Sequence, residues 1–238
     1  MNSTKKIITW VSLFAIAMGF MESAVVIYLR ELYYKTGFEF PLKQISPFIA
    51  KVEFSREIAT IIMLVACGIL AGKNKLQRFA YFALAFAIWD IFYYVFLYIC
   101  LDWPQSLCTW DILFLIPVPW VGPIWAPCLL SLLMIVGALF VIYKVDKQPN
   151  YKVSRNFWWL LILGALVCIV SFMWDYLVYS NNKEVKWNVN SDKNLFSEID
   201  TYIPHQFNSS LFFTGFLLML FPVFYSIYTS LKLKNNKK

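Results

Sequence analysis

The sequence predicts an all-α, polytopic integral membrane protein built as a bundle of about six transmembrane helices. Of its 238 residues, 60% are hydrophobic, and the mean hydropathy is +0.61, whereas soluble domains contain about 45–50% apolar residues. Apolar windows close to the ~20 residues that cross a bilayer recur along the whole chain. The polar stretches between them are too short for a soluble domain, so residues 1–238 are expected to form a single membrane domain.

Each apolar window is expected to form one helix, and the predicted spans are residues 7–29, 57–72, 79–101, 126–143, 157–179 and 206–231. The first window follows two lysines, as in a signal peptide, but it is long and has no clean cleavage site, so we expect a retained span. The second window is short. We expect it to begin inside residues 38–56, whose mixture of Phe, Ile and Lys is typical of an interfacial helix on the membrane surface.

A proline-rich segment, residues 111–127, precedes the fourth span and contains Pro117, Pro119, Pro123 and Pro127. The apolar run Ile112–Tyr143 has 32 residues and would form a straight helix about 48 Å long, far more than the ~30 Å core of a bilayer. Because proline removes an amide donor and favours extended geometry before it, we expect extended backbone over residues 117–120 and a turn at Gly122–Pro123. The fourth span should start near Ala126, with Pro127 in its first turn.

Two placements of this segment remain open from the sequence. Irregular backbone at membrane depth survives only where protein buries it or where it lines a cavity. The segment is therefore predicted to be re-entrant, with Trp120 and Trp125 lining a pocket in the bundle. The alternative is an interfacial crossover in which both tryptophans belong to the aromatic belt.

The distribution of lysine and arginine predicts the orientation. With a cytoplasmic N-terminus, 13 of the 21 basic residues fall in the inner segments, so both termini are expected in the cytoplasm. Short loops and frequent lysine and asparagine indicate a bacterial cytoplasmic membrane. The net charge of +7 is mostly this bias. It predicts membrane lipids as partners and no nucleic acid, because the charges are divided among short loops.

Acidic residues inside apolar spans are the strongest functional signal, and they are Glu22, Asp90 and Asp175. Burying an ionised carboxylate at the centre of a span costs roughly 2.5–3.5 kcal/mol. We predict that Glu22 and Asp90 are catalytic, as a carboxylate pair that supplies a general acid and a general base. The structural alternatives are an ion pair of Glu22 with Arg56, hydrogen bonds from Tyr93 or Tyr94 to Asp90, and a hydrated helix end at Asp175.

Other polar and aromatic side chains lie toward the same, outer side of the predicted bundle. A ligand-binding role is expected for Arg30, Arg56, Glu57, Tyr94, Asp111, Trp120, Trp125 and His205. The inner halves of the spans offer Leu, Ile, Phe and Ala instead. This asymmetry predicts an outward-facing intramembrane pocket that is closed on its inner side.

Such a pocket indicates a protein that binds a lipid-soluble molecule, isoprenoid or lipid-like, and that could transform it by acid–base chemistry. Whether the protein is an enzyme stays open at this point. One alternative is a small proton- or cation-coupled transporter or channel component, in which His205 gates the outer mouth. The other is a non-catalytic membrane assembly factor whose acids only hold helices together.

Metal and cofactor chemistry has no sequence support. The chain has one histidine and no HExxH, nucleotide-binding loop or dinucleotide fingerprint, so neither a metal site nor a cofactor is predicted. The five cysteines form no CxxC motif. Cys100 and Cys108 both fall near the end of the third span, where either a disulfide or two free thiols would fit.

Overall fold

The fold was obtained as a computed structural model, which describes residues 3–34, 37–41, 43, 46–114, 118–182 and 201–235. Its elements are α1 (Ser3–Tyr33), α2 (Pro47–Ala71), α3 (Lys75–Leu101), β1 (Trp110–Phe114), β2 (Trp120–Pro123), α4 (Trp125–Lys147), α5 (Arg155–Asn182) and α6 (Ser209–Asn235). Six helices are long and apolar enough to cross a membrane. The expected all-α polytopic bundle is therefore confirmed, with the addition of one short hairpin.

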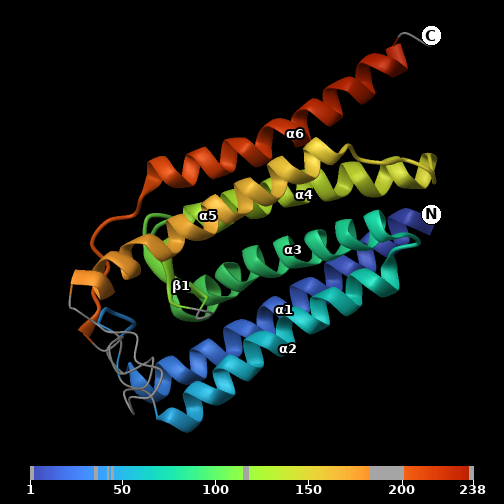
Figure 1. The fold of residues 1–238 in the computed structure, drawn as a ribbon. Coiled ribbons are helices and arrows are strands. Elements are labelled where there is room, and N and C mark those ends of the chain that lie inside the picture. The colour runs from blue at the N-terminus through green and yellow to red at the C-terminus, as the bar shows by residue number, and fades with distance from the viewer. Residues whose placement is uncertain are drawn as a thin grey trace.

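The two chain termini lie at the same end of the bundle, because an even number of long helices returns the chain to its starting side (Figure 1). We call this the terminal end. The β1–β2 hairpin lies toward the opposite end, which we call the hairpin end. These names describe the molecule without assigning either end to a side of the membrane.

The second helix begins at Pro47, inside the segment that was expected to lie on the membrane surface. Ser46 Oγ accepts a hydrogen bond from the Ile49 amide at 3.3 Å, and proline fits the first helical position because that amide has no helical partner. From there α2 runs without a break to Ala71. Residues 47–56 are therefore the first turns of a spanning helix and not a separate interfacial helix.

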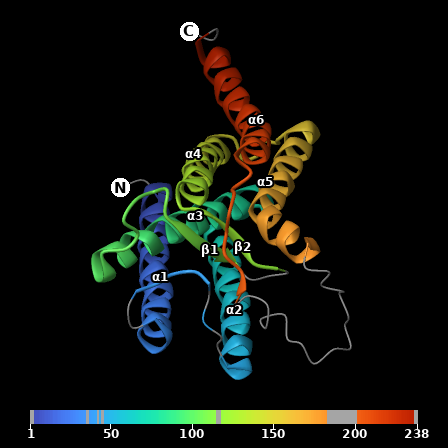
Figure 2. The same ribbon diagram turned by 90° about the vertical axis from the view of Figure 1, so that its left-hand side faces the viewer.

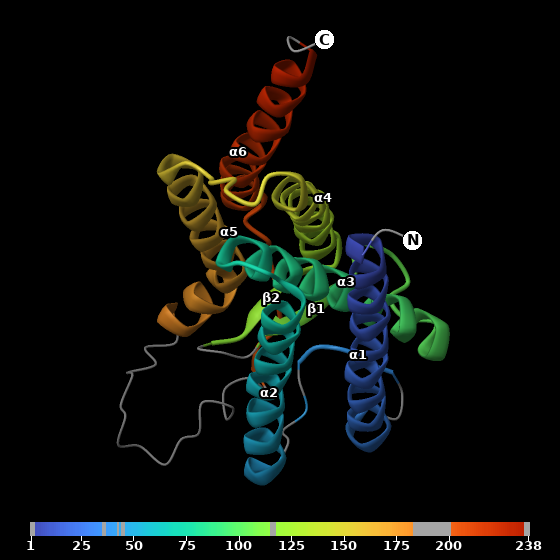
Figure 3. The ribbon, with the colours of Figure 1, turned by 90° about the vertical axis from the view of Figure 1, so that its right-hand side faces the viewer.

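The helices form two groups. In the first, α3 packs against α1, α2 and α4, and in the second, α5 packs against α6. The groups meet through a few contacts between α4 and α6 and through β2, which packs against α5. Figures 2 and 3 show α1 and α2 on one side of the molecule and α6 on the other, with α3 and α4 between them.

Glycines permit the close crossing of α5 and α6. A Cβ atom added to Gly164 would lie 2.6 Å from the Gly215 carbonyl oxygen, and one added to Gly215 would lie 2.7 Å from Cys168 Sγ. Only hydrogen fits in these spaces. Small residues at such crossings let backbones approach, which matters in lipid because burial of apolar surface between helices gains little there.

The proline-rich segment forms an antiparallel hairpin, with Asp111 opposite Gly122, Trp110 opposite Pro123, and an irregularity between Ile112 and Phe114. The expected turn at Gly122–Pro123 is therefore wrong. Proline is tolerated there because a two-stranded hairpin consists of edge strands, in which an amide can be missing.

The end of the segment follows the sequence expectation more closely. The fourth helix starts at Trp125, and Pro127 lies in its first turn. Pro117 falls within residues 115–117, outside the described part of the chain. Val118 and Val121 of the hairpin are buried in a cluster with Tyr176 and Tyr202, so protein surrounds this irregular backbone.

Candidate functional site

Glu22 is held by a neighbouring helix. Arg56 Nη1 of α2 donates to Glu22 Oε1, Thr60 Oγ1 donates to Glu22 Oε2 at 3.5 Å, and Arg56 Nε reaches Glu53 Oε2 at 2.8 Å. Within the described residues, no hydrogen bond or ion pair joins Glu22 to Asp90. The expected pair of Glu22 with Asp90 does not form, because the Glu22 carboxylate forms an ion pair with Arg56. The structure contains the alternative pairing that links α1 with α2.

Asp90 bridges two helices at the centre of the bundle. Ser131 Oγ of α4 donates to Asp90 Oδ2 at 2.8 Å, a contact that the sequence analysis did not anticipate. The neighbouring carboxylate is Asp111 of β1, which lies close enough to act on Asp90 electrostatically. Asp111, and not Glu22, is therefore the acid that the fold brings to Asp90.

Asp111 and Arg30 form a loose, buried ion pair in which Arg30 Nη2 lies 3.8 Å from Asp111 Oδ1. The guanidinium carbon of Arg30 is 3.8 Å from the ring centre of Trp103 and 4.4 Å from that of Phe38. Asp111 is only 3% exposed and Arg30 only 8%. In the described part of the chain, Asp111 Oδ2 and Arg30 Nε have no hydrogen-bond partner, which is unusual for buried polar atoms.

Burial raises the pKa of Asp111 from its ordinary 3.8 to about 6, although the nearby Arg30 guanidinium and the Tyr94 and Tyr93 hydroxyls oppose the shift. The two tyrosines that were considered as donors to Asp90 therefore act as donors to Asp111. A carboxyl with this pKa holds its proton at mildly acidic pH and releases it near neutral pH. We call Asp90, Ser131, Asp111 and Arg30 the acid cluster. Tyr94, buried on α3, also interacts electrostatically with both carboxylates.

The other expected ligand-binding residues are divided between two places. Glu57 is buried on α2 and interacts electrostatically with Arg56, on the α1–α2 side. Trp125 packs against Phe207, Phe212 and Phe213 near the start of α6. It does not join the acid cluster.

His205 lies on the α5–α6 side and is exposed. Its amide donates to Asp175 Oδ2 at 3.1 Å, and the Tyr202 hydroxyl donates to the same oxygen at 2.6 Å. The Gln206 amide donates to Asp175 Oδ1 at 3.1 Å. Asp175 therefore fixes the chain that leads into α6.

A large apolar groove of ≈ 460 Å³ lies between α3, α4, α5 and α6. Its walls are leucine, phenylalanine and alanine side chains, and small residues such as Ala83, Gly137 and Ala165 create its space. At the hairpin end, Trp120 stacks on Phe172 with ring centres 6.5 Å apart. From the sequence alone, the only signal of this groove was the recurrence of small residues on three apolar helices.

The groove ends close to the acid cluster. Phe86 lines the groove on α3, and Asp90 lies four residues further on, so the two share a helix face one turn apart. Leu130 lines it on α4 immediately before Ser131. Trp120 lines it from the hairpin that also carries Asp111. Asp90 is thus one helical turn from the groove on α3, and Asp111 lies in the hairpin that contributes Trp120 to it.

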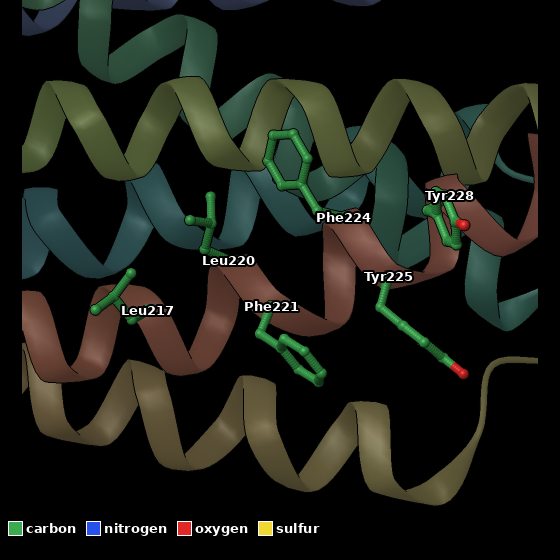
Figure 4. Close-up of a pocket in the computed structure, with 6 residues that line it drawn as sticks. All are labelled: Leu217, Leu220, Phe221, Phe224, Tyr225 and Tyr228. Carbon is green, nitrogen blue, oxygen red and sulfur yellow. The ribbon is translucent and has the colours of Figure 1, made fainter.

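A second hollow, of ≈ 580 Å³, lies along α6 alone and is shown in Figure 4. It is lined by Leu217, Leu220, Phe221, Phe224, Tyr225 and Tyr228. Phe221 is 64% exposed and Tyr228 is 62% exposed. A face formed by one helix and open to this extent is what a lipid-facing surface looks like, whereas the groove is enclosed by four helices.

Metal-ligating geometry is not found in the described ranges, where no group of three or more His, Cys, Asp or Glu side chains could hold a metal ion. All five cysteines are free thiols, and Cys100 and Cys108 are exposed. Of the two alternatives for this pair, the structure contains the thiols. Acid–base chemistry and hydrogen bonding are what the acid cluster offers.

Comparisons with protein-family models, with curated proteins and with solved structures found no match for this chain. Its function is therefore argued from geometry.

Proposed function

We propose that this membrane protein binds a single-chain, lipid-soluble amphiphile, with the apolar chain in the groove and the polar head at the acid cluster. The observation that carries the proposal is the position of the groove, which ends one helical turn from Asp90. Asp90 and Asp111 are the residues expected to act on the head of the ligand. In this proposal Glu22, first expected in a catalytic role, has a structural role through its ion pair with Arg56.

The groove has the size and lining of a lipid site. Its ≈ 460 Å³ is within the range of about 300–1,000 Å³ that is typical of small-molecule sites. It follows α3 from Leu76 to Phe86, about 15 Å at the rise of an α-helix. A slender alkyl or isoprenoid chain fits an elongated apolar space of this kind.

The acid cluster supplies the polar part of the site. Asp111 Oδ2 is buried without a hydrogen-bond partner among the described residues, so a donor on the ligand would relieve an unfavourable state. Because the pKa of Asp111 is raised by burial to about 6, the carboxyl can also give or accept a proton near neutral pH. These properties support acid–base chemistry on the bound head group.

The hairpin end is proposed to face the outside. At the terminal end, Lys73 lies in the α2–α3 loop, Lys144 and Lys147 lie in the last turn of α4, and Lys152 lies in the α4–α5 loop. A membrane-impermeant maleimide applied to intact cells should label Cys100, in the last turn of α3, and Cys108, in the segment that follows, because both are exposed. Loss of the labelling in Cys100→Ser/Cys108→Ser assigns it to these two cysteines, and labelling of them that requires broken cells would contradict this orientation.

A structural role is the second candidate, and it is favoured by one observation. Glu22–Arg56 joins α1 to α2, and Arg30–Asp111 joins α1 to the hairpin, so these charges hold elements together. Transport has weaker support, because the groove between the acid cluster and the terminal end is lined by apolar side chains such as Ala83, Met134 and Leu161.

Native mass spectrometry of protein extracted gently from its own membrane tests the proposal. Wild type should retain an amphiphile that Gly137→Phe loses, because the added ring would occupy the groove. Gly137→Ala is the matched control, since its Cβ would lie 3.6 Å from the Val223 methyl groups, an ordinary contact. Wild type with no bound amphiphile, or equal retention by all three proteins, would contradict the proposal.

A further inference from the structure

Among the described residues, the buried and half-buried charges around Arg30 and Arg56 do not balance. The arginines in this network are Arg30 and Arg56, and the acids around them are Glu22, Glu53, Glu57, Asp90 and Asp111. Arg56 is shared among the three glutamates. Among the described residues, this leaves Arg30 as the cation beside the two aspartates of the acid cluster.

Arg30 only partly neutralises the negative charge of Asp90 and Asp111. Its 3.8 Å separation from Asp111 is longer than a hydrogen bond, and its guanidinium is held between the rings of Trp103 and Phe38. The Tyr93 and Tyr94 hydroxyls act on the Asp111 carboxyl, but in the described part of the chain no donor lies within hydrogen-bond distance of its buried Oδ2. Asp90 receives one neutral hydroxyl, from Ser131 at 2.8 Å.

We infer that the head group that fits the acid cluster is a protonated amine, so that the ligand class is a long-chain cationic amphiphile. This inference rests on the proposed function and adds the sign of the head group's charge. An ammonium group has three donors and no acceptor, which matches the unpartnered Asp111 oxygen and the second oxygen of Asp90. It also brings the positive charge that this end of the groove lacks.

The other head groups fit less well. A carboxylate or phosphate would add negative charge beside two buried aspartates, and like charges at short range in a poorly solvated site repel strongly. A hydroxyl group could donate one hydrogen bond and would leave the charges unbalanced. The order of binding expected at the site is therefore amine, then alcohol, then carboxylate.

The order can be measured with tetradecylamine, tetradecanol and tetradecanoate, which share one chain. The protein in nanodiscs of zwitterionic lipid is labelled by a tetradecanol probe with a diazirine near the end of its chain. Each compound then competes for the labelling of α4 and α5 peptides. At about pH 8 the amine is cationic, the carboxylate is anionic and Asp111 is ionised. The amine should compete about tenfold or more better than the carboxylate.

Variants separate the site from the bilayer. Asp90→Asn and Asp111→Asn should each reduce the preference for the amine several-fold, while melting temperatures check that each variant is folded. Asp102→Asn is the matched control, because it removes an exposed carboxylate from the end of α3 and should leave the preference unchanged.

The outcomes are distinguishable. Equal competition, stronger competition by the carboxylate, or an amine preference that both aspartate variants retain would overturn the inference about charge. The proposed lipid site would survive those results. Failure of the probe to label groove peptides at all would reject both proposals.

Discussion

The two sides of α3 contrast in how they treat polar groups. On the side of α1, α2 and the hairpin, charged side chains form buried or half-buried ion pairs, two of which connect separate elements. On the side of α5 and α6, packing relies on glycine crossings and aromatic contacts around an apolar groove. The comparison teaches that the buried ion pairs gather on one side of α3, whereas the groove on the other side is lined by uncharged residues.

The largest loss of stability is expected from a substitution at the close crossing of α5 and α6, on the apolar side of α3. Gly164→Leu would place a side chain where a Cβ alone lies 2.6 Å from the Gly215 backbone, so α5 and α6 must separate. We expect loss of the folded protein, measured as yield of monodisperse protein and as thermal stability in detergent. Gly137→Ala, with ordinary contacts at the added Cβ, should behave as wild type. Normal stability of Gly164→Leu would refute the close crossing.

Removal of a buried ion-pair partner on the side of α1 and α2 should lower the free energy of unfolding by less than this, but still substantially. Arg56→Met would leave Glu22 and Glu53 without their partner, and removal of one member of a buried pair typically costs about 3–5 kcal/mol. Because the Arg56 side chain is 22% exposed, we expect about 3 kcal/mol, measured by reversible unfolding in mixed micelles. Adding Glu22→Gln should recover part of the loss. A loss below ~1 kcal/mol would show that solvent already screens this pair.

The buried carboxyl of Asp111 predicts that the stability of the protein depends on pH. Its pKa in the folded protein is about 6, above the ordinary 3.8, so the folded state binds the proton more tightly than the unfolded chain. The contribution of Asp111 to the free energy of unfolding should therefore be greatest below about pH 4 and fall by about 2–3 kcal/mol as the pH rises to about 6. The dependence of the free energy of unfolding on pH is compared with that of Asp111→Asn, which has no titrating carboxyl at this position. Parallel pH profiles of the two proteins would exclude the buried carboxyl as its source.

The smallest effect is expected from an exposed ion pair that serves as the contrast to Arg56. Lys73 Nζ lies 3.4 Å from Asp146 Oδ1, but the Lys73 side chain is 67% exposed. Surface pairs contribute little because water and salt screen them, so Lys73→Met should change stability by less than about 1 kcal/mol. The same unfolding assay tests this value. A loss as large as that of Arg56→Met would remove the distinction between buried and exposed pairs.

Much of the architecture was readable from the sequence, because a bilayer imposes a length and an apolar composition on every span. The six helices follow from that constraint. The position of Pro127 follows as well, since proline is suited to the first turn of a helix. The hairpin did not follow: pairing of Asp111 with Gly122 depends on contacts with α5 that no local pattern encodes.

The candidate site was only partly readable. Glu22 and Asp90 could be identified as costly residues, and the pairing of Glu22 with Arg56 could be considered because both charges are visible. The role of Ser131 was not visible, since serine is common in membrane helices. The groove was hidden for a different reason: a hollow depends on how apolar faces of four helices fit together, and the sequence gives only their composition.

The central claim is that the groove, and not merely the lipid-facing surface, holds a chain. The diazirine probe described above tests it most directly, by mapping where the probe attaches and whether unlabelled tetradecylamine competes. We expect saturable labelling on α4 and α5, around Gly137 and Ala165, that Gly137→Phe abolishes. Labelling confined to the exposed α6 face of Figure 4, around Phe221 and Tyr228, that unlabelled competitor leaves unchanged would contradict the claim.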